Sequence, residues 1–148
     1  MVKPVYKTET FDLPNSFCAL IGKVRQKLVD NADKELAPSE LTFAQVIVLL
    51  KLSNGSARTP GDFCRSLDYD PGSMTRLLDR IENKGFIKRV RSAEDRRSVE
   101  LELTEKGKEL CPQLIPIMVD LNNRLLSGFS SSEVRTLEEL LKRVLVSD

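Results

Sequence analysis

The sequence predicts a mainly α-helical protein with one small two-stranded β-hairpin. Over most of the chain, apolar residues recur at intervals of three and four, the spacing of an amphipathic helix. Residues 99–103 instead alternate strictly between apolar and acidic side chains, as a half-buried strand does. With 148 residues the chain has the length of one domain, which can bury a core without a disulfide or a metal.

Two helices are expected in the N-terminal part of the chain. The first covers residues 15–36, where one helical face is apolar and comprises Phe17, Leu20, Ile21, Val24, Leu28 and Val29. The second begins after Thr42, because Thr42 and Gln45 have the residue types and the spacing of a capping box. The polar turn at residues 53–56 ends this second helix.

The middle of the chain predicts two helices joined by a turn of about three residues. Thr59 and Pro60 are a typical helix start, and this short helix ends near residue 67. Asp70 and Pro71 repeat the start, and the next helix continues to residue 84, before Gly85. Two helices connected in this way form a helix-turn-helix.

Residues 86–103, which we call the wing, complete this unit. Strands are expected at residues 86–90 and 99–103, around a charged loop at residues 91–98. A winged helix-turn-helix is therefore predicted over residues 41–104, with residues 71–84 as its recognition helix.

Two further helices follow the wing. Thr104 caps a long helix over residues 105–126, in which Pro112 and Pro116 are expected to cause kinks. A capping box at residues 130–133 begins the last helix, which ends near residue 145. The flanking regions 1–36 and 105–148 carry more apolar surface than a three-helix core can cover. We therefore expect them to form a helical dimerisation region that binds a second copy of the chain.

The composition argues against an enzyme. The chain has no histidine, which excludes Ser-His and Cys-His pairs and histidine-ligated metals, and it has no glycine-rich phosphate loop. Its three cysteines are widely spaced, which predicts neither a disulfide framework nor a metal site and suits a reducing cytoplasm. We expect no cofactor, no secretory signal and no membrane span, and hence a cytoplasmic protein.

The basic residues are unevenly distributed. Residues 76–97 contain eight basic and four acidic residues, whereas the rest of the chain contains 15 basic and 18 acidic ones. A basic segment on a mildly acidic body is typical of a local nucleic-acid surface, although a solvated helix face would give the same pattern.

Three motifs resemble the MarR family of bacterial winged helix-turn-helix transcription regulators. They are LTFAQ at residues 41–45, DPGSMTRLLDRIENKGFI at residues 70–87, and DRRS at residues 95–98 followed by LELTEKG at residues 101–107. The resemblance implies a homodimer that binds a pseudo-palindrome of double-stranded DNA on the bacterial nucleoid. It implies a recognition helix in the major groove and a wing in the adjacent minor groove. It often implies repression, relieved by a small aromatic or phenolic ligand or by cysteine oxidation.

The helical period assigns the DNA-facing residues of the recognition helix. Its core face comprises Met74, Leu77, Leu78 and Ile81, so Ser73, Thr75, Arg76, Asp79 and Arg80 point outward. Arg76 is the best base reader, because a guanidinium matches O6 and N7 of guanine. Ser73 and Thr75 can meet bases or phosphates. Phosphate contact or none is expected for Arg80, Lys84, Lys88, Arg89 and Arg91. Asp79 is expected to hold Arg76 or Arg80, or to form a plain surface ion pair.

The tip of the wing is the other predicted contact with DNA. Arg96 and Arg97 lie in the loop, and Asp95 can accept a hydrogen bond from Arg97 and hold it extended. In the family that the sequence resembles, the arginine at the position of Arg97 enters the minor groove and the aspartate orients it.

The cysteines leave one alternative open. Cys18 has the register of the reactive cysteine in the organic-hydroperoxide-sensing members, but Gly22 and Ala32 stand where assisting tyrosines are expected. Among its apolar neighbours, Cys18 is expected to be dispensable. Cys64 is expected to be buried and inert, and Cys111 to have a structural packing role. An alternative of another class is a winged-helix module that binds only proteins, against which the outward Arg76 and the Arg96–Arg97 loop argue.

Overall fold

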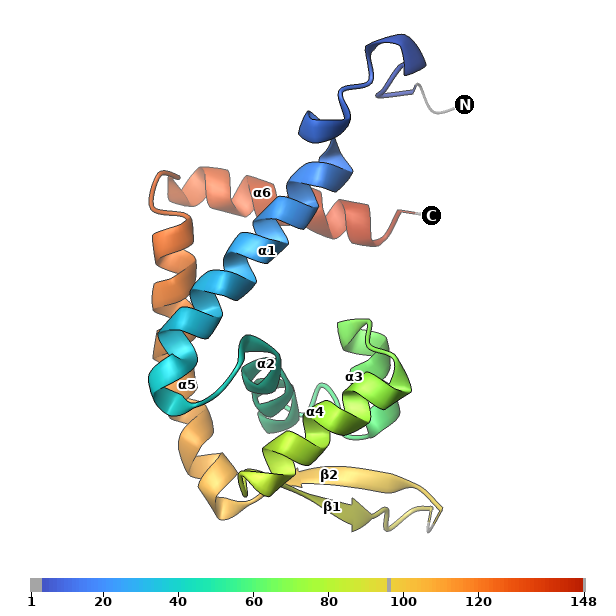
Figure 1. The fold of residues 1–148 in the computed structure, drawn as a ribbon, viewed down its shortest axis with the longest axis vertical. Helices are drawn as coiled ribbons and strands as arrows, with labels where there is room; N and C mark the ends of the chain where they lie inside the picture. Colours follow the sequence, from blue (N-terminus) through green and yellow to red (C-terminus); the bar gives the residue numbers. More distant parts are fainter. Residues whose placement is uncertain (1–3, 96, 148) are drawn as a thin grey trace.

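The computed structural model describes residues 4–95 and 97–147 of the chain (Figure 1). Its elements are α1 (Phe17–Leu36), α2 (Phe43–Ser53), α3 (Pro60–Leu67), α4 (Pro71–Asn83), β1 (Ile87–Arg91), β2 (Val99–Leu103), α5 (Glu105–Leu125) and α6 (Ser131–Leu145). Short 3-10 turns occupy Thr8–Thr10, Leu13–Asn15 and Ala37–Ser39. The predicted fold, mainly α-helical with one antiparallel two-stranded sheet, is confirmed.

The helices begin where the sequence places the caps. Thr42 and Gln45 form the expected capping box of α2, and Asp70 and Thr104 cap α4 and α5. At α1 the expectation was two residues early: the helix starts at Phe17, after a separate 3-10 turn. Helix α5 runs through both of its prolines as one continuous helix.

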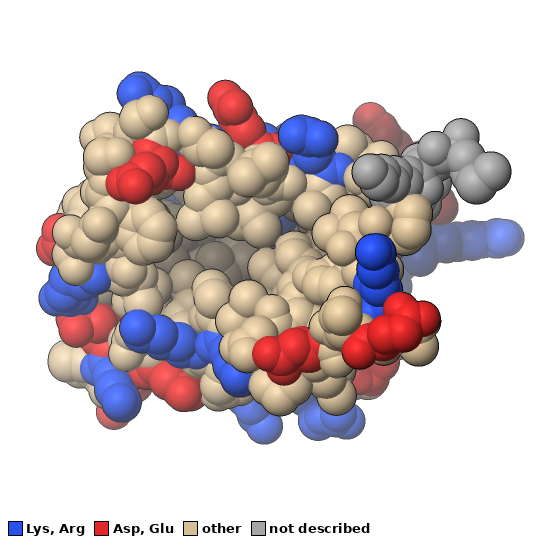
Figure 2. Space-filling model, turned by 90° about the horizontal axis from the view of Figure 1, so that it is seen from above, with Lys and Arg blue, Asp and Glu red and all other residues tan. Residues whose placement is uncertain are grey.

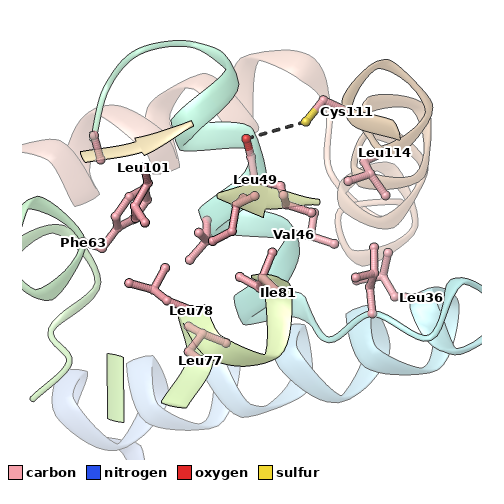
Figure 3. Packing of buried hydrophobic residues seen from close by; sticks show 14 of the residues in the cluster. Leu36, Val46, Leu49, Phe63, Leu77, Leu78, Ile81, Leu101, Cys111 and Leu114 are labelled. Carbon is pink, nitrogen blue, oxygen red and sulfur yellow. Dashed lines mark hydrogen bonds between the residues drawn. The ribbon is translucent and has the colours of Figure 1, made fainter. Parts of the chain in front are cut away.

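The core lies between the helix-turn-helix, the wing and the facing sides of α1 and α5 (Figure 3). Its fully buried side chains come from α1, α2, α3, α4, β1 and α5, and the largest are Phe63, Leu36, Leu49, Met74, Leu78, Ile81, Ile87 and Leu114. Val46 and Leu49 of α2 lie at the centre of this packing, which makes α2 the support of the whole unit. The middle of the chain thus shares one core with the facing sides of α1 and α5.

The flanking helices are different. Large apolar side chains stay exposed on the N-terminal half of α1 and on α6, namely Phe17, Leu20, Ile21, Val24, Leu137, Leu140, Val144 and Leu145. Helix α6 has no buried residue, and no other described element packs extensively against it. Figure 2 looks onto the end of the molecule that carries α6 and the start of α1, where uncharged surface surrounds a hollow and charges gather at the rim.

In the part of the chain that the structure describes, no single helix is long and apolar enough to cross a membrane. One bent pair, residues 17–39 with 43–53, passes that test by length and composition alone.

Candidate nucleic-acid interface

The N-terminus of α4 is fixed by Asp70. Its side chain accepts a hydrogen bond of 2.9 Å from the backbone N–H of Ser73, and Pro71 occupies the first turn. The hydroxyl and the backbone amide of Ser73 hold the pKa of the Asp70 carboxyl below its usual range. A firm cap at this end determines where the exposed face of the helix begins.

The predicted division of α4 into a core face and an outer face is confirmed. Met74, Leu77, Leu78 and Ile81 are buried, whereas Thr75, Arg76 and Arg80 are exposed and Ser73 is half-buried. The guanidinium of Arg76 donates a hydrogen bond of 3.0 Å to Oγ of Ser73. The hydroxyl of Thr75 donates one of 2.8 Å to the carbonyl of Pro71. These contacts hold the polar side chains of the first two helical turns against the helix surface.

Asp79 has a different partner from those expected. It accepts a hydrogen bond of 2.7 Å from Nη2 of Arg89 in β1, rather than contacting Arg76 or Arg80. Nη1 of Arg89 forms a second ion pair, with Glu82 of α4. Arg89 is therefore engaged within the protein.

Two further basic residues have partners inside the chain. The ammonium of Lys84 donates to the backbone carbonyl of Glu40 and, at 3.3 Å, to Oε1 of Gln45. Lys88 forms an ion pair of 3.2 Å with Glu102 on the neighbouring strand. These contacts tie the end of α4 to the start of α2, and one wing strand to the other.

The wing tip is organised through its backbone. Oδ1 of Asp95 accepts a hydrogen bond of 2.9 Å from the backbone N–H of Arg97, and Oγ of the buried Ser92 accepts from the amides of Glu94 and Asp95. Asp95 thus fixes the turn instead of binding the guanidinium of Arg97, with which it forms no ion pair in the described structure. Arg97 is exposed, and Arg96 lies outside the described residues.

The three cysteines differ in burial. Cys111 is buried, its thiol donates to the carbonyl of Leu49 at 3.7 Å, and burial raises its pKa (Figure 3). Cys64 is half-buried and packs against the core, so it is not the fully buried thiol that was expected. Cys18 is exposed in the single chain, together with its apolar neighbours Phe17 and Leu20.

A groove of about 650 Å³ lies between α1, α2 and the end of α3. Its lining is mainly apolar, with arginines and aspartates at its edge, and includes Leu28, Val29, Phe43, Ile47, Leu67, Tyr69, Arg25 and Arg65. Within the described ranges, no cluster of three or more Cys, Asp or Glu side chains has the arrangement of a metal site.

Comparison with known proteins identifies the family. The profile of the MarR family matches residues 39–98. The multiple antibiotic resistance protein MarR of Escherichia coli (strain K12) is 36% identical over 127 residues, which cover 85% of this chain and 88% of that protein. The chain belongs to the MarR family. This family comprises transcription regulators and not enzymes.

Further MarR-family relatives agree with this assignment. The transcriptional repressor MprA of Escherichia coli (strain K12) is 31% identical over 82% of this chain and 70% of its own length. A crystal structure of mutant MarR from E. coli complexed with operator DNA has 35% identity and a TM-score of 0.79, and covers 91% of this chain and 99% of that one. The chain thus has the winged-helix architecture of a protein whose crystal structure was determined in complex with operator DNA.

Sequence reasoning missed the partners of the basic residues of this MarR-type unit. Glu82 was not singled out, although it lies three residues after Asp79 and therefore on the same helical face. Strand alternation would have placed Arg89 on the opposite face from Lys88. The hydrogen bond from Lys84 to Glu40 joins residues that are 44 positions apart. Its acceptor is a backbone carbonyl, which every residue has, so no sequence pattern indicates it.

Proposed function

We propose that this protein is a homodimeric repressor that binds a pseudo-palindromic operator through α4 and the wing. The observation that carries the proposal is the two-sided recognition helix. Four apolar side chains of α4 are buried, and the opposite face presents Thr75, Arg76 and Arg80 to solvent. The adjoining wing presents Arg97 at its tip.

The roles of these residues follow from their chemistry. Arg76 reads a guanine edge in the major groove, with Ser73 as its support and Thr75 beside it. Arg80 and Arg96 neutralise phosphates, and Arg97 enters the minor groove, whose negative potential is greatest where it is narrow. Asp95 orients Arg97 by fixing the turn that carries it.

The dimer assigned to residues 1–36 and 105–148 follows from the uncovered apolar side chains of α1 and α6. A helix with a continuous apolar face gains most of its stability from burying that face. A second copy of the chain offers the same surface in a twofold arrangement. Two recognition helices related by a twofold axis match half-sites about 10 base pairs apart.

The groove between α1, α2 and the end of α3 supports the proposal that a small aromatic or phenolic ligand releases the protein from DNA. Its apolar lining accommodates an aromatic ring, and Arg25 or Arg65 at its edge attracts an acidic or phenolic group. The groove touches α1 on one side and the segment before α4 on the other. A ligand there would favour one arrangement of these elements over another, and so would change affinity for DNA. We place this regulator in the bacterial cytoplasm, on the nucleoid.

The test is genome-wide footprinting of the purified protein under three conditions, namely alone and with either of two additions. We expect protection of a pseudo-palindrome by the protein alone, and release of the DNA when benzoate is added as the simplest aromatic acid. A protected asymmetric half-site contradicts the dimer. Absence of any protection at low salt favours the alternative of a winged-helix module that binds only proteins.

The third condition is the addition of an organic hydroperoxide, which tests thiol sensing through Cys18. We expect the footprint to survive, because a tyrosine pair is missing around that cysteine. Release that disappears in a Cys18→Ser variant would make thiol-based sensing the principal mechanism.

A further inference from the structure

Arg89 connects the wing to the recognition helix. It lies in the middle of β1, opposite Leu101 of β2. Its backbone N–H donates to Oε1 of Glu82 at 3.1 Å, its Nη1 pairs with Oε2 of the same carboxylate, and its Nη2 donates to Asp79 at 2.7 Å. One residue of the wing thus engages two carboxylates on one face of α4.

The contact with Glu82 is partly sheltered from solvent, and the contact with Asp79 is more exposed. The side chain of Arg89 is 29% exposed, that of Glu82 34% and that of Asp79 51%. Charge-assisted hydrogen bonds of a fork-shaped guanidinium are stronger and more directional than those of a lone ammonium. The guanidinium and the backbone N–H of Arg89 bind two carboxylates of α4, so this contact constrains the angle between β1 and α4.

The base of the wing is held by the core, where Ile87 and Leu101 are buried and the backbone N–H of Leu101 donates to the carbonyl of Arg58 at 2.8 Å. Arg89 adds a side-chain contact between the wing and α4. A two-stranded sheet is only marginally stable by itself. The covalent link from α4 to β1 is the short segment at residues 84–86, which contains the left-handed Gly85. The neighbouring ion pair, Lys88 with Glu102, joins the two strands to each other and does not reach α4.

We propose that Arg89, with Glu82 and Asp79, is a positioning residue that fixes the wing relative to the recognition helix for simultaneous contact with both grooves. This inference rests on the proposed DNA-binding function. It gives Arg89 the role of holding the wing and α4 in a fixed arrangement, instead of the phosphate contact that its charge would favour. It also gives two acidic residues a favourable role in binding a polyanion.

The sign of one substitution separates positioning from simple electrostatics. Glu82→Ala removes a negative charge close to the DNA-binding face, so electrostatics alone predicts tighter binding. Positioning predicts weaker binding, because the wing loses two of the three hydrogen bonds that join Arg89 to α4 and keeps only the one to Asp79. Glu102→Ala is the matched control, since it removes one carboxylate from the hairpin that carries Arg89 but leaves the contact with α4 intact.

The experiment measures affinity for the duplex that the wild-type protein selects from random-sequence DNA, over a range of salt concentrations. Circular dichroism and sedimentation first establish that each variant is folded and has the wild-type mass. We expect Glu82→Ala to bind about three to ten times more weakly, and Glu102→Ala to bind as well as the wild type or more tightly. Arg89→Ala should weaken binding by a similar factor with an unchanged salt slope. Adding Glu82→Ala to Arg89→Ala should then weaken binding by a smaller factor than Glu82→Ala does alone, because only the hydrogen bond from the backbone N–H of residue 89 is left to lose.

Two results would overturn the positioning role. The first is equal or tighter binding by Glu82→Ala. The second is a fall of about one in the salt slope of Arg89→Ala, which is the signature of a lost phosphate contact. A wild-type protein that selects no DNA would instead refute the proposed function itself.

Discussion

The middle of the chain and its flanks differ in how they bury their apolar residues. In residues 41–104, side chains such as Phe63 and Leu78 are fully buried within one chain. In α6, every residue remains at least partly exposed, and Leu140 is 48% exposed although it lies on an apolar stripe. Both regions have sequences with a clear amphipathic period, so the period alone does not tell which partner covers the apolar face.

This difference separates two kinds of stability. The middle region is held by contacts within the chain, and substitutions there change the free energy of unfolding directly. The N-terminal half of α1 and helix α6 lack a packing partner within the described chain, and substitutions there should act through association with a second copy. Variants in the two regions are therefore best distinguished by measuring the free energy of unfolding, the mass in solution and the affinity for DNA.

The largest effect is expected for Phe63→Ala in α3. Phe63 is 0% exposed and contacts the core between α3 and β2, so its truncation leaves a cavity in a region with no alternative partner. We expect a loss of about 3–5 kcal/mol in the free energy of unfolding, measured by urea denaturation at fixed protein concentration. A loss below about 1 kcal/mol would show that the middle region does not depend on this core.

Next comes Leu140→Asp in α6. In an isolated chain this exposed position should tolerate the change within about 0.5 kcal/mol. In a dimer the substitution places two carboxylates in an apolar contact, and we expect the dissociation constant to rise by about a hundredfold or more. Sedimentation over a range of concentrations measures it. Arg135→Asp, on the polar face of the same helix, should leave the mass unchanged, and a wild-type monomer would disprove the assignment of the flanks.

The sequence predicts the middle region better than the flanks for a physical reason. Caps such as Thr42 and Asp70 and the left-handed Gly85 act within a few residues, so their residue types are sufficient evidence. The pairing of Arg89 with Glu82 depends on how the wing folds back, which no local pattern encodes. For α6 the sequence correctly indicates an apolar face, but no described element of the chain covers that face.

Within the middle region, Arg97→Ala should change DNA affinity without changing stability. The side chain is exposed at the wing tip, so its removal costs little in folding. Loss of a guanidinium from the minor groove should weaken operator binding by roughly 1–3 kcal/mol and flatten the salt dependence. Arg124→Ala removes an exposed arginine of α5 that pairs with Glu35, and it should leave affinity unchanged. Equal losses of DNA affinity in the two variants would mean that only the net charge of the protein determines its binding to DNA.

The smallest effect is expected at Asp95, and its sign is the informative part. Asp95→Ala removes a negative charge near DNA but also removes the acceptor for the backbone N–H of Arg97, the contact that fixes the turn. We expect affinity to fall by less than for Arg97→Ala, measured by titration of the same duplex. Asp95→Asn is the matched control, because an asparagine oxygen accepts the same hydrogen bond without the charge. If the turn is what matters, Asn should bind at least as tightly as the wild type. Weaker binding by Asn would indicate that the carboxylate acts on the guanidinium of Arg97 itself, and tighter binding by Ala would leave Asp95 no orienting role.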